Sequence, residues 1–575
     1  MKHRLVNSVI KEDYVRTLLK ERGIEDVDRF LNPTWEDIQS PLELTNMKEG
    51  VELLASILEI ETPHICLIVD CDVDGFTSSS IMYQYIKAIN SNTDITYILH
   101  EKKQHGLSDC INKILDSDIT YDLVLIPDAA SNDFEYTEKL KAHNIPVLIL
   151  DHHILESEVS TNVVLINNQA SENYRNKDLS GAGVAWQFCR AYDEFVGFEI
   201  AQAFTDLAAL GIIGDMMGLN EIENQAIIKF GLGMVNNQFF RYLIEKQDFS
   251  MGGKLNPTTV AFYIVPMINA MIRVGSMDEK KRLFEAFVNP EKIVPCNKRG
   301  AKGTTEKVYI ESARECTNAK SKQDREKEKI VGALEAKIFK HDLLENKILF
   351  IRLDDDDEFP SELNGLVAMQ LASRYSRPTI VARLNDEGMV RGSARGLNES
   401  SLTSFKDFLN QSGLFEYTAG HDNAFGISVP NTALDKLHEY ANDALKDMDL
   451  SESAFDVNFE RHAMDSDLKN LIYDIAEYED IYGQKMTEPL IYVDSINLKQ
   501  GEWRVMGQRK DTVSWEKNGV KYIQFHAADL IEELNQYPEV QIEIVGRATL
   551  NEWMGNVSPQ IMVKSYEIKN GQYAF

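Results

Sequence analysis

Cysteine is scarce in this sequence, and the few cysteines form no recognisable pair. There are six among 575 residues, namely Cys66, Cys71, Cys110, Cys189, Cys296 and Cys316, and no two of them stand in a CxxC spacing. That pattern excludes a dense disulfide framework and a thiolate zinc site of the usual spacing. We therefore expect buried, reduced thiols in a cytoplasmic protein.

Long uncharged hydrophobic runs are also lacking. Residues 1–23 contain no apolar core of the kind found in signal peptides. We find no stretch of about 18 apolar residues without charge, which a membrane-spanning helix would need. We expect neither a signal peptide nor a membrane segment, and no membrane partner.

Positive charge is in short supply as well. Sixty Lys and Arg stand against 91 Asp and Glu, which gives a formal net charge of −31. A chain this acidic repels polyanions at long range, so composition alone argues against a nucleic-acid partner. Hydrophobic residues at 43% and charged residues at 26% are ordinary globular values, which exclude a disordered or collagen-like chain. At roughly 150 residues per domain, the length predicts three or four domains.

Apolar runs alternate with helical patterns in the first half of the chain. The runs 64–70, 95–100, 121–128 and 145–151 read as buried strands, and 78–89 reads as a helix between the first two. Alternating strands and helices predict an α/β fold with a parallel sheet. Three of the runs end in an acid, and that edge of an open parallel sheet is where sites form.

The second half divides by composition. Residues 292–330 hold eleven Lys and Arg against six acids, and 305–341 reads as one long helix. A second α/β block follows over 347–430, and the stretch 451–482 is acidic, which a solvated linker explains. The alternating strands of 485–575 predict a small β-barrel of OB type. The local excess of +5 in 292–330 offers a basic track that the global charge hides.

Three acids alternate at the end of the first strand. Asp70, Asp72 and Asp74 precede Gly75, and in an extended chain all three would face one side. Three close carboxylates repel one another unless a cation neutralises them. We expect a tight turn at Gly75 to bring the backbone close to a ligand. An Asp-rich turn without a ligand is the alternative.

Further acids and histidines converge on the same predicted edge. Asp128 ends one strand, Asp151-His152-His153 ends another, and Asp215 interrupts an apolar stretch where an unpaired charge would be costly. Carboxylates with imidazole suit Mn²⁺ or Mg²⁺ better than a thiolate metal. Several shared acids predict two close divalent ions, the arrangement that hydrolyses phosphoesters.

These motifs resemble the DHH phosphoesterase superfamily, and within it the RecJ-like exonucleases. DVDG (72–75), Asp128, DHH (151–153) and GIIGDMMGL (211–219) look like its four motifs. GSARG (392–396) and AGHDNAFG (419–426) look like the associated DHHA1 domain, and 545–563 looks like the OB domain. The resemblance covers nearly the whole chain. It implies an N-terminal helical extension (1–60), a DHH catalytic domain (61–290), a basic linker helix (291–345), a DHHA1 domain (346–450), and an acidic linker with an OB-like domain (451–575).

The resemblance also implies residue roles. His153 would be the catalytic histidine, with Asp151 orienting the site. Asp70 would either bind a metal ion itself or hold a ligand in place from behind. In the DHHA1 motifs, Ser393 and Arg395 resemble a phosphate-binding pair, and Gly420 and His421 belong to a loop lining the same cleft. The metal ligands would be Asp72, Asp74, Asp128, His152 and Asp215.

Two departures from the family pattern stand out. Ala130 occupies a position that is usually Gly, two residues after Asp128. The segment 100–107 has no Arg where the family often carries one before a Gly-Tyr-Gly turn. Lys102 or Lys103 could replace it, but Lys is a point charge and Arg a fork, so selection of a 5′-phosphate is in question.

The function implied by the resemblance is a hydrolase, a 5′-to-3′ exonuclease that degrades single-stranded DNA to 5′-mononucleotides in repair or recombination. It would use two Mn²⁺ or Mg²⁺ ions and act as a cytoplasmic monomer, with a single-strand-binding protein as a candidate partner. The OB-like block would guide the strand. Among its candidates are Trp503, Tyr522 and Trp553, although core packing explains any one of these aromatic residues more readily. A nano-RNase or small-nucleotide phosphatase of the same superfamily, and a non-catalytic replication scaffold, are the alternatives.

Overall fold

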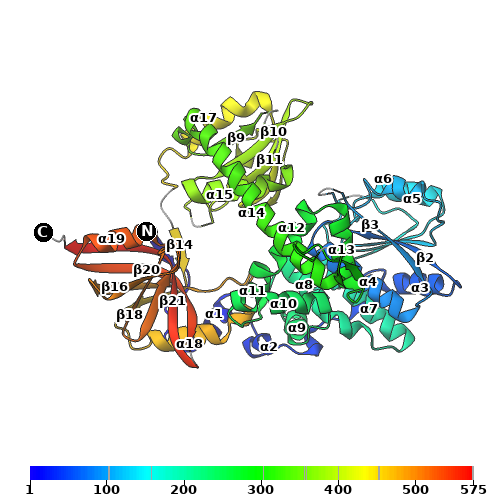
Figure 1. Cartoon of the computed structure of the whole chain (residues 1–575), viewed down its shortest axis with the longest axis horizontal. Coiled ribbons are helices and arrows are strands. Elements are labelled where there is room, and N and C mark those ends of the chain that lie inside the picture. Colours follow the sequence, from blue (N-terminus) through cyan, green and yellow to red (C-terminus); the bar gives the residue numbers. More distant parts are fainter. Residues whose placement is uncertain are drawn as a thin grey trace. The chain divides into compact units, whose positions relative to one another are not determined.

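The computed structural model describes residues 1–101, 104–156, 158–301, 303–354, 357, 359–398, 400–450, 454–553 and 555–572. Figure 1 shows the helices and strands of the chain. Its internal contacts divide the chain into two compact units. We call residues 24–323 with 479–487 the parallel-sheet unit, and residues 1–23, 324–478 and 488–575 the mixed unit. The division of the chain into five domains stays a prediction.

A five-stranded parallel sheet forms the centre of the parallel-sheet unit. Its strand order is β3-β2-β4-β5-β6, and every neighbouring pair is parallel. The strands β4 and β5 are fully buried because helices cover both faces, which is why they read as continuous apolar runs. This confirms the predicted α/β fold. The strands are β2 (His64–Val69), β3 (Asp94–Leu99), β4 (Leu123–Pro127), β5 (Val147–Asp151) and β6 (Val163–Asn167).

Helices pack on both faces of this sheet. Side chains of one face, such as Cys66 and Val124, form a core with residues of α5 and α6. On the other face, α4, α7 and α8 pack against one another. The helices are α2 (Val27–Leu31), α3 (Met47–Leu58), α4 (Val73–Ile89), α5 (Ile111–Leu115), α6 (Phe134–Ala142), α7 (Gly181–Val196), α8 (Thr205–Gly214), α9 (Ile222–Gly233), α10 (Gln238–Met251), α11 (Pro257–Tyr263), α12 (Val265–Val274) and α13 (Met277–Val288).

One segment of this unit has the length and mean hydropathy of a membrane span, although it contains the charged residue Arg273. It is Pro257–Val274, and half of it is buried inside the protein. The segment divides into α11 and α12 at Ile264, two residues before Pro266. Its helices pack against α4, α8 and α13, as core helices do.

The predicted long helix is α14 (Val308–Lys340), which follows the hairpin of β7 (Ile293–Pro295) and β8 (Thr305–Lys307). Several of the basic residues in 292–330 pair with acids: Lys292 with Glu285, Lys307 with Glu291, and Arg314 with Glu306 and Glu311. Glu285 and Glu291 lie outside 292–330, so the pairs with Lys292 and Lys307 offset part of the +5 excess, whereas Glu306 and Glu311 are already counted in it.

A second α/β sheet lies in the mixed unit. Its order is β12-β13-β11-β10-β9, with only β9 and β10 parallel. Its elements are β9 (Leu349–Leu353), α15 (Asn364–Tyr375), β10 (Thr379–Leu384), β11 (Met389–Arg395), α16 (Phe405–Gln411), β12 (Tyr417–His421), β13 (Ala424–Pro430) and α17 (Leu434–Ala444).

The C-terminal block contains a seven-stranded sheet, in the order β15-β16-β20-β21-β19-β18-β17. The chain's first strand, β1 (Lys2–Leu5), pairs in parallel with β14 (Ala454–Val457) beside it. The other elements are α1 (Tyr14–Glu21), β15 (Phe459–His462), α18 (Leu468–Glu477), β16 (Leu490–Lys499), β17 (Trp503–Met506), β18 (Thr512–Lys517), β19 (Val520–Gln524), α19 (Ala528–Gln536), β20 (Glu539–Trp553) and β21 (Asn556–Gln572).

Candidate metal centre

The acids after β2 do not alternate along a strand as predicted. The strand ends at Val69, and Asp72 is already the N-cap of α4, accepting a hydrogen bond from Gly75 N at 3.0 Å. Asp74 therefore lies in the first helical turn. The predicted alternation of the three acids along an extended strand was wrong. Asp is as common at a helix N-cap as after a strand, and Asp72 takes the N-cap position.

Gly75 is not in a turn either. It lies inside α4, where a Cβ would come within 2.6 Å of Asp70 Cβ and 2.7 Å of the Asp70 carbonyl. The glycine is required because the helix starts directly against the end of β2. Gly75 allows the start of α4 to contact Asp70 at the end of β2. The predicted tight turn that would bring the backbone close to a ligand is not present there.

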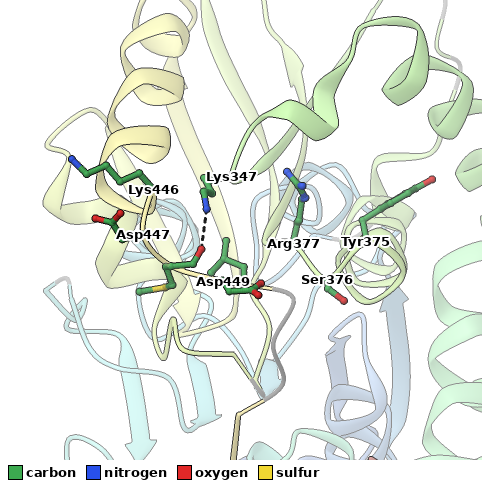
Figure 2. Close-up of a pocket in the computed structure, with 9 residues that line it drawn as sticks. Lys347, Tyr375, Ser376, Arg377, Lys446, Asp447 and Asp449 are labelled. Atoms are coloured by element: carbon green, nitrogen blue, oxygen red, sulfur yellow. Dashed lines mark hydrogen bonds between the residues drawn. The ribbon is translucent and has the colours of Figure 1, made fainter. Parts of the chain in front are cut away.

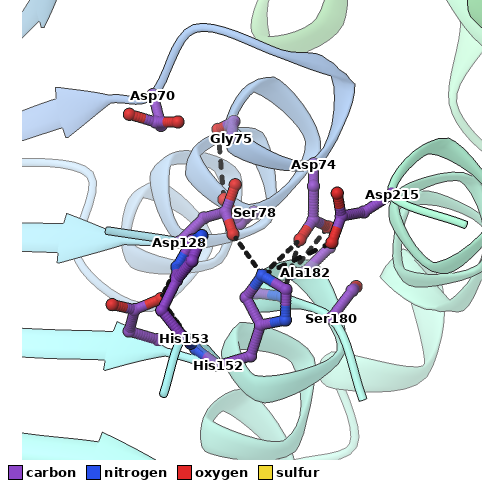
Figure 3. Close-up of polar contacts among 12 residues, drawn as sticks. Asp70, Asp74, Gly75, Ser78, Asp128, His152, His153, Ser180, Ala182 and Asp215 are labelled. Atoms are coloured by element: carbon purple, nitrogen blue, oxygen red, sulfur yellow. Dashed lines mark hydrogen bonds and ion pairs between the residues drawn. The ribbon is translucent and has the colours of Figure 1, made fainter. Parts of the chain in front are cut away.

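His152, directly after β5, is the centre of the site (Figure 3). Its Nε2 lies 3.2 Å from Asp128 Oδ1, 3.5 Å from Asp215 Oδ2 and 3.9 Å from Asp74 Oδ2. Two ligands bound at about 2.1 Å to one ion stand roughly 3.0–4.2 Å apart, depending on the angle between them. The separations around His152 therefore fit ligands that share a cation.

The Asp74 carboxylate is aimed by the start of α7. Gly181 N donates to Asp74 Oδ2 at 2.6 Å and Ala182 N to Oδ1 at 3.0 Å, while Ser180 caps the helix. A helix N-terminus stabilises a nearby anion through its free N–H groups and its dipole. Gly181 also touches Asp128, since a Cβ there would lie 2.4 Å from Asp128 Oδ1. The glycine therefore allows α7 to support two acids at once.

Burial and mutual repulsion make the acids costly as anions. Burial, followed by the charge of Asp74, raises the pKa of Asp215 to about 8 and raises the pKa of Asp128 well above its ordinary value. Asp128 Oδ1 accepts no hydrogen bond from any described residue. Burial lowers the pKa of His152, which favours the neutral form of imidazole that binds a metal. A divalent cation is the partner that this donor set fits.

The loop after β4 holds two residues in left-handed backbone conformation. Asp128 has φ 67° and Ala130 has φ 76°. Glycine adopts such angles without strain, whereas in alanine the Cβ clashes with the following carbonyl oxygen. The departure from the family pattern at Ala130 thus falls on a position whose geometry favours Gly.

His153 and Asp151 form a pair beside His152. Asp151 is fully buried and accepts from the backbone of Ser131 at 3.0 Å and of His152 at 2.7 Å, and its Oδ1 lies 2.7 Å from His153 Nδ1. This bond with Asp151 raises the pKa of His153 to about 9. The imidazole is half exposed, so its Nε2 edge can meet a substrate while Asp151 fixes the ring.

Asp70, for which the sequence left open a role as ligand or as a group behind the ligands, lies apart from the acids around His152 (Figure 3). Its Oδ2 lies 2.6 Å from His105 Nδ1. The sequence did not point to His105 or to His100, which directly follows β3. The segment 100–107 had been considered only for a basic side chain that could bind the 5′-phosphate. Lys102 and Lys103 lie outside the described residues. The strand-end rule, applied to β3 as it was to β2, would have found His100.

Arg273 was also missed. It lies in the last turn of α12, and burial lowers its pKa while Asp72 opposes the shift. A partly buried guanidinium beside an acidic centre is a candidate contact for a phosphate. An isolated Arg in an apolar helix gives no signal in the sequence until the fold places that helix.

The predicted phosphate-binding residues come together in the mixed unit. Arg395 ends β11 and pairs with Thr379 and Ala424, and His421, at the end of β12, pairs with the same Ala424. Ser393 lies two residues before Arg395 on β11, and Gly420 has φ 130°, an angle that favours glycine. The sheet register therefore brings Ser393, Arg395, Gly420 and His421 together at one end of β11 and β12, beside the start of β13.

A cavity of about 330 Å³ opens beside the starts of β9 and β10 (Figure 2). Lys347 and Arg377 line it, and Lys347 Nζ donates to the Met448 carbonyl at 2.9 Å. Asp447 and Asp449 share its wall and offset these cations. The cavity carries no cluster of the kind found around His152.

Two of the aromatic candidates in the C-terminal block are core residues. Trp503 is 8% exposed, and Tyr522 is fully buried and stacks on Trp515. The side chain of Trp553 lies outside the described residues. Core packing, the alternative considered for these residues, holds for Trp503 and Tyr522.

Two family models match the chain. The N-terminal domain of the DHH family matches residues 64–212, and the RecJ OB domain matches residues 463–565. The Thermus thermophilus RecJ crystal structure in complex with Mn²⁺ shares the fold, with a TM-score of 0.73 and 18% identity over 100% of this chain and 80% of that one.

Full-length relatives extend the match. YorK, encoded by the SPbeta prophage of Bacillus subtilis and named as a single-strand DNA-specific exonuclease, is 34% identical over 99% of this chain and 98% of its own length. RecJ of Bacillus subtilis is 24% identical over 97% of this chain and 68% of its own. Identity at this level along the whole length establishes the family: the chain belongs to the RecJ-like single-strand DNA-specific exonucleases of the DHH type.

Proposed function

We propose that this chain is a metal-dependent hydrolase that degrades single-stranded DNA from its 5′ end and releases 5′-mononucleotides. One observation carries the proposal: three acids converge on the buried His152 at the edge of a parallel sheet, in a chain of this family. The family supplies the substrate class, and the donor set supplies the chemistry.

Two divalent ions, Mn²⁺ or Mg²⁺, fit the acids at this edge. Asp74, Asp128, His152 and Asp215 would hold one, and Asp72 with Asp128 the other. Bound there, the ions would acidify a water and offset the phosphate charge. The protein's own part is to fix these side chains, which the start of α7 does for Asp74.

His153 is the proposed catalytic histidine. Asp151 binds its Nδ1 and leaves Nε2 free to donate a proton to a phosphate or leaving-group oxygen. Asp151 touches no substrate in this scheme. It orients the ring, as carboxylates behind catalytic imidazoles do.

Ser393, Arg395, Gly420 and His421 are the proposed phosphate contacts of the mixed unit. Arg395 offers two parallel N–H donors to a terminal phosphate. The seven-stranded block would hold the strand in the manner of other OB domains, through basic and aromatic side chains. Roles for these residues rest on the family motifs.

The test is digestion of end-labelled substrates with Mn²⁺. We expect 5′-phosphorylated single strands to yield mononucleotides, and duplex or 5′-blocked strands to resist. Asp128→Ala should be inactive, and Asp118→Ala, at an exposed position of the same unit, should match the wild type. Full activity in Asp128→Ala would refute the proposed site. Preference for RNA of two to five nucleotides would identify a nano-RNase instead.

The remaining assignments are also proposals. A monomeric state, a single-strand-binding protein as partner, a cytoplasmic location and a role in repair or recombination come from the family resemblance. Light scattering on the purified chain checks the first of these. A dimer would contradict it without affecting the metal centre.

A further inference from the structure

A second group of ligand-type side chains lies at the end of β2, apart from the group around His152. Asp70 and Cys71 follow β2 directly, and His105 comes from the loop after β3. One ligand atom from each lies within 4.8 Å of the others. Measured from the same nitrogen, His105 Nδ1, Cys71 Sγ is 3.9 Å away and Asp70 Oδ2 is 2.6 Å away. The shorter distance is a hydrogen bond, which a shared ion would replace by displacing its proton. The three donors are thus an oxygen, a sulfur and a nitrogen.

The loop that carries His105 is fixed by the fold. Leu107 N donates to Asp133 Oδ2 at 2.6 Å, and Leu107 itself is fully buried. Gly106, with φ 70°, lies so close to Asp133 that a Cβ would stand 2.2 Å from its Oδ2. His105 is therefore held next to Asp70 by the backbone on its C-terminal side, before any ligand arrives.

Two buried atoms beside this group lack hydrogen-bond partners among the described residues. They are Asp70 Oδ1 and His100 Nε2, which face each other at 3.7 Å. His100 is oriented by Asp109, whose Oδ1 lies 2.6 Å from His100 Nδ1. Leaving such a buried atom without a hydrogen-bond partner destabilises the fold. The cost points to a ligand at Asp70 that would satisfy the carboxylate.

We propose that Asp70, Cys71 and His105 bind a divalent transition metal of the zinc class, separate from the ions held around His152. Thiolate and imidazole donors select such metals, whereas Mg²⁺ and Mn²⁺ prefer carboxylates and water. Binding releases the thiol proton of Cys71 and the proton shared by His105 and Asp70. His100 lies behind the Asp70 carboxylate and helps to orient it. Removing a side chain that orients a metal ligand lowers metal affinity roughly 10- to 100-fold.

The sulfur donor gives the site a signature independent of nuclease activity. Cobalt(II), a spectroscopic substitute for zinc, shows a sulfur-to-metal charge-transfer band in the near ultraviolet only when a thiolate binds it. The group around His152 contains oxygen and nitrogen donors alone and cannot produce that band. Failure of this proposal and failure of the proposed exonuclease function are therefore distinguishable.

The experiment titrates chelator-stripped, full-length protein with Co²⁺. We expect the band in the wild type and in Cys66→Ser, a matched control at a buried thiol inside β2. Cys71→Ser should lose the band, and His105→Gln and His100→Ala should each need roughly 10- to 100-fold more Co²⁺ to reach it. Asp128→Ala, inactive as a nuclease, should keep it.

Two results would overturn the proposal: no band in the wild type at saturating Co²⁺, or a band that survives in Cys71→Ser. Circular dichroism checks that each variant is folded. If Cys71→Ser does not fold, His105→Gln decides, because a thiolate band with unchanged Co²⁺ affinity in that variant contradicts the site.

Discussion

Replacing Gly181 by alanine tests whether the contact between α7 and the acids supports cation binding. The added Cβ would lie 2.4 Å from Asp128 Oδ1 and 2.7 Å from Asp128 Cα, where ordinary contact begins at 3.4 Å. The start of α7 must therefore retreat by about 1 Å, a clash of the size that overpacking penalises. The bond from Gly181 N to Asp74 Oδ2, now 2.6 Å, would lengthen to roughly 3.6 Å, which is no longer a hydrogen bond.

The expected loss follows from that bond. A hydrogen bond to a charged group is worth about 1.5–3 kcal/mol, and each 1.36 kcal/mol is tenfold in an equilibrium constant. Gly181→Ala should therefore bind Mn²⁺ roughly 10- to 150-fold more weakly, because Asp74 loses the donor that aims it.

Calorimetric titration with Mn²⁺ measures this affinity, and the Mn²⁺ concentration for half-maximal digestion checks it. Gly233→Ala, at the end of α9 with no atom within 4 Å of the added Cβ, is the control and should behave as wild type. A folded Gly181→Ala protein with wild-type Mn²⁺ affinity would refute the reasoning.

Three further outcomes follow from the same centre. Without metal, burial and neighbouring acids raise the pKa of Asp72 to about 6 and that of Asp215 to about 8, above their values in the unfolded chain. The stability that these two groups contribute is therefore complete below about pH 4 and is lost as the pH rises through 6 and 8. The melting temperature in chelator should fall between pH 5 and 8, and Asp215→Asn should flatten the upper part of that fall. Ala130→Gly should raise the free energy of unfolding by roughly 1 kcal/mol by relieving the φ of 76°, and an unchanged denaturant midpoint would contradict this. Asp151→Asn should lower kcat by roughly 10²- to 10⁴-fold, because His153 loses its orienting partner, while Mn²⁺ affinity stays within twofold; a matching loss of affinity would instead mean that Asp151 shapes the metal centre.

The strand ends were predictable from sequence because buried parallel strands are uniform apolar runs. Asp128 and His152 follow such runs, and their meeting at one edge needs only the rule that parallel strands share a direction. The position of Asp215 at the end of α8 was not derivable in this way, since a helix can approach the sheet at many angles. The sequence marked Asp215 as a costly charge in an apolar stretch, and the family motif assigned it as a ligand.

The errors have a local physical cause. Asp72 could end a strand or cap a helix, and three-residue spacing to Gly75 does not decide between them. His105 and Arg273 were missed because their significance depends on which segments the fold places next to Asp70 and Asp72. Periodicity identifies elements, whereas the neighbours of a loop or a helix end are set by packing.

The parallel pairing of β1 with β14 has a consequence for how the protein is made. The partner of residues 2–5 is residues 454–457, so the first strand leaves the ribosome about 450 residues before its neighbour exists. At about 5–20 residues per second, that interval is roughly 20–90 s. The chain crosses between its two units four times, at residues 23/24, 323/324, 478/479 and 487/488. Residues 24–323 of the parallel-sheet unit are made before residues 454–457, so β1 should find its partner only after most of that unit has been synthesised. A product truncated before residue 454 would leave β1 as an open edge prone to aggregation.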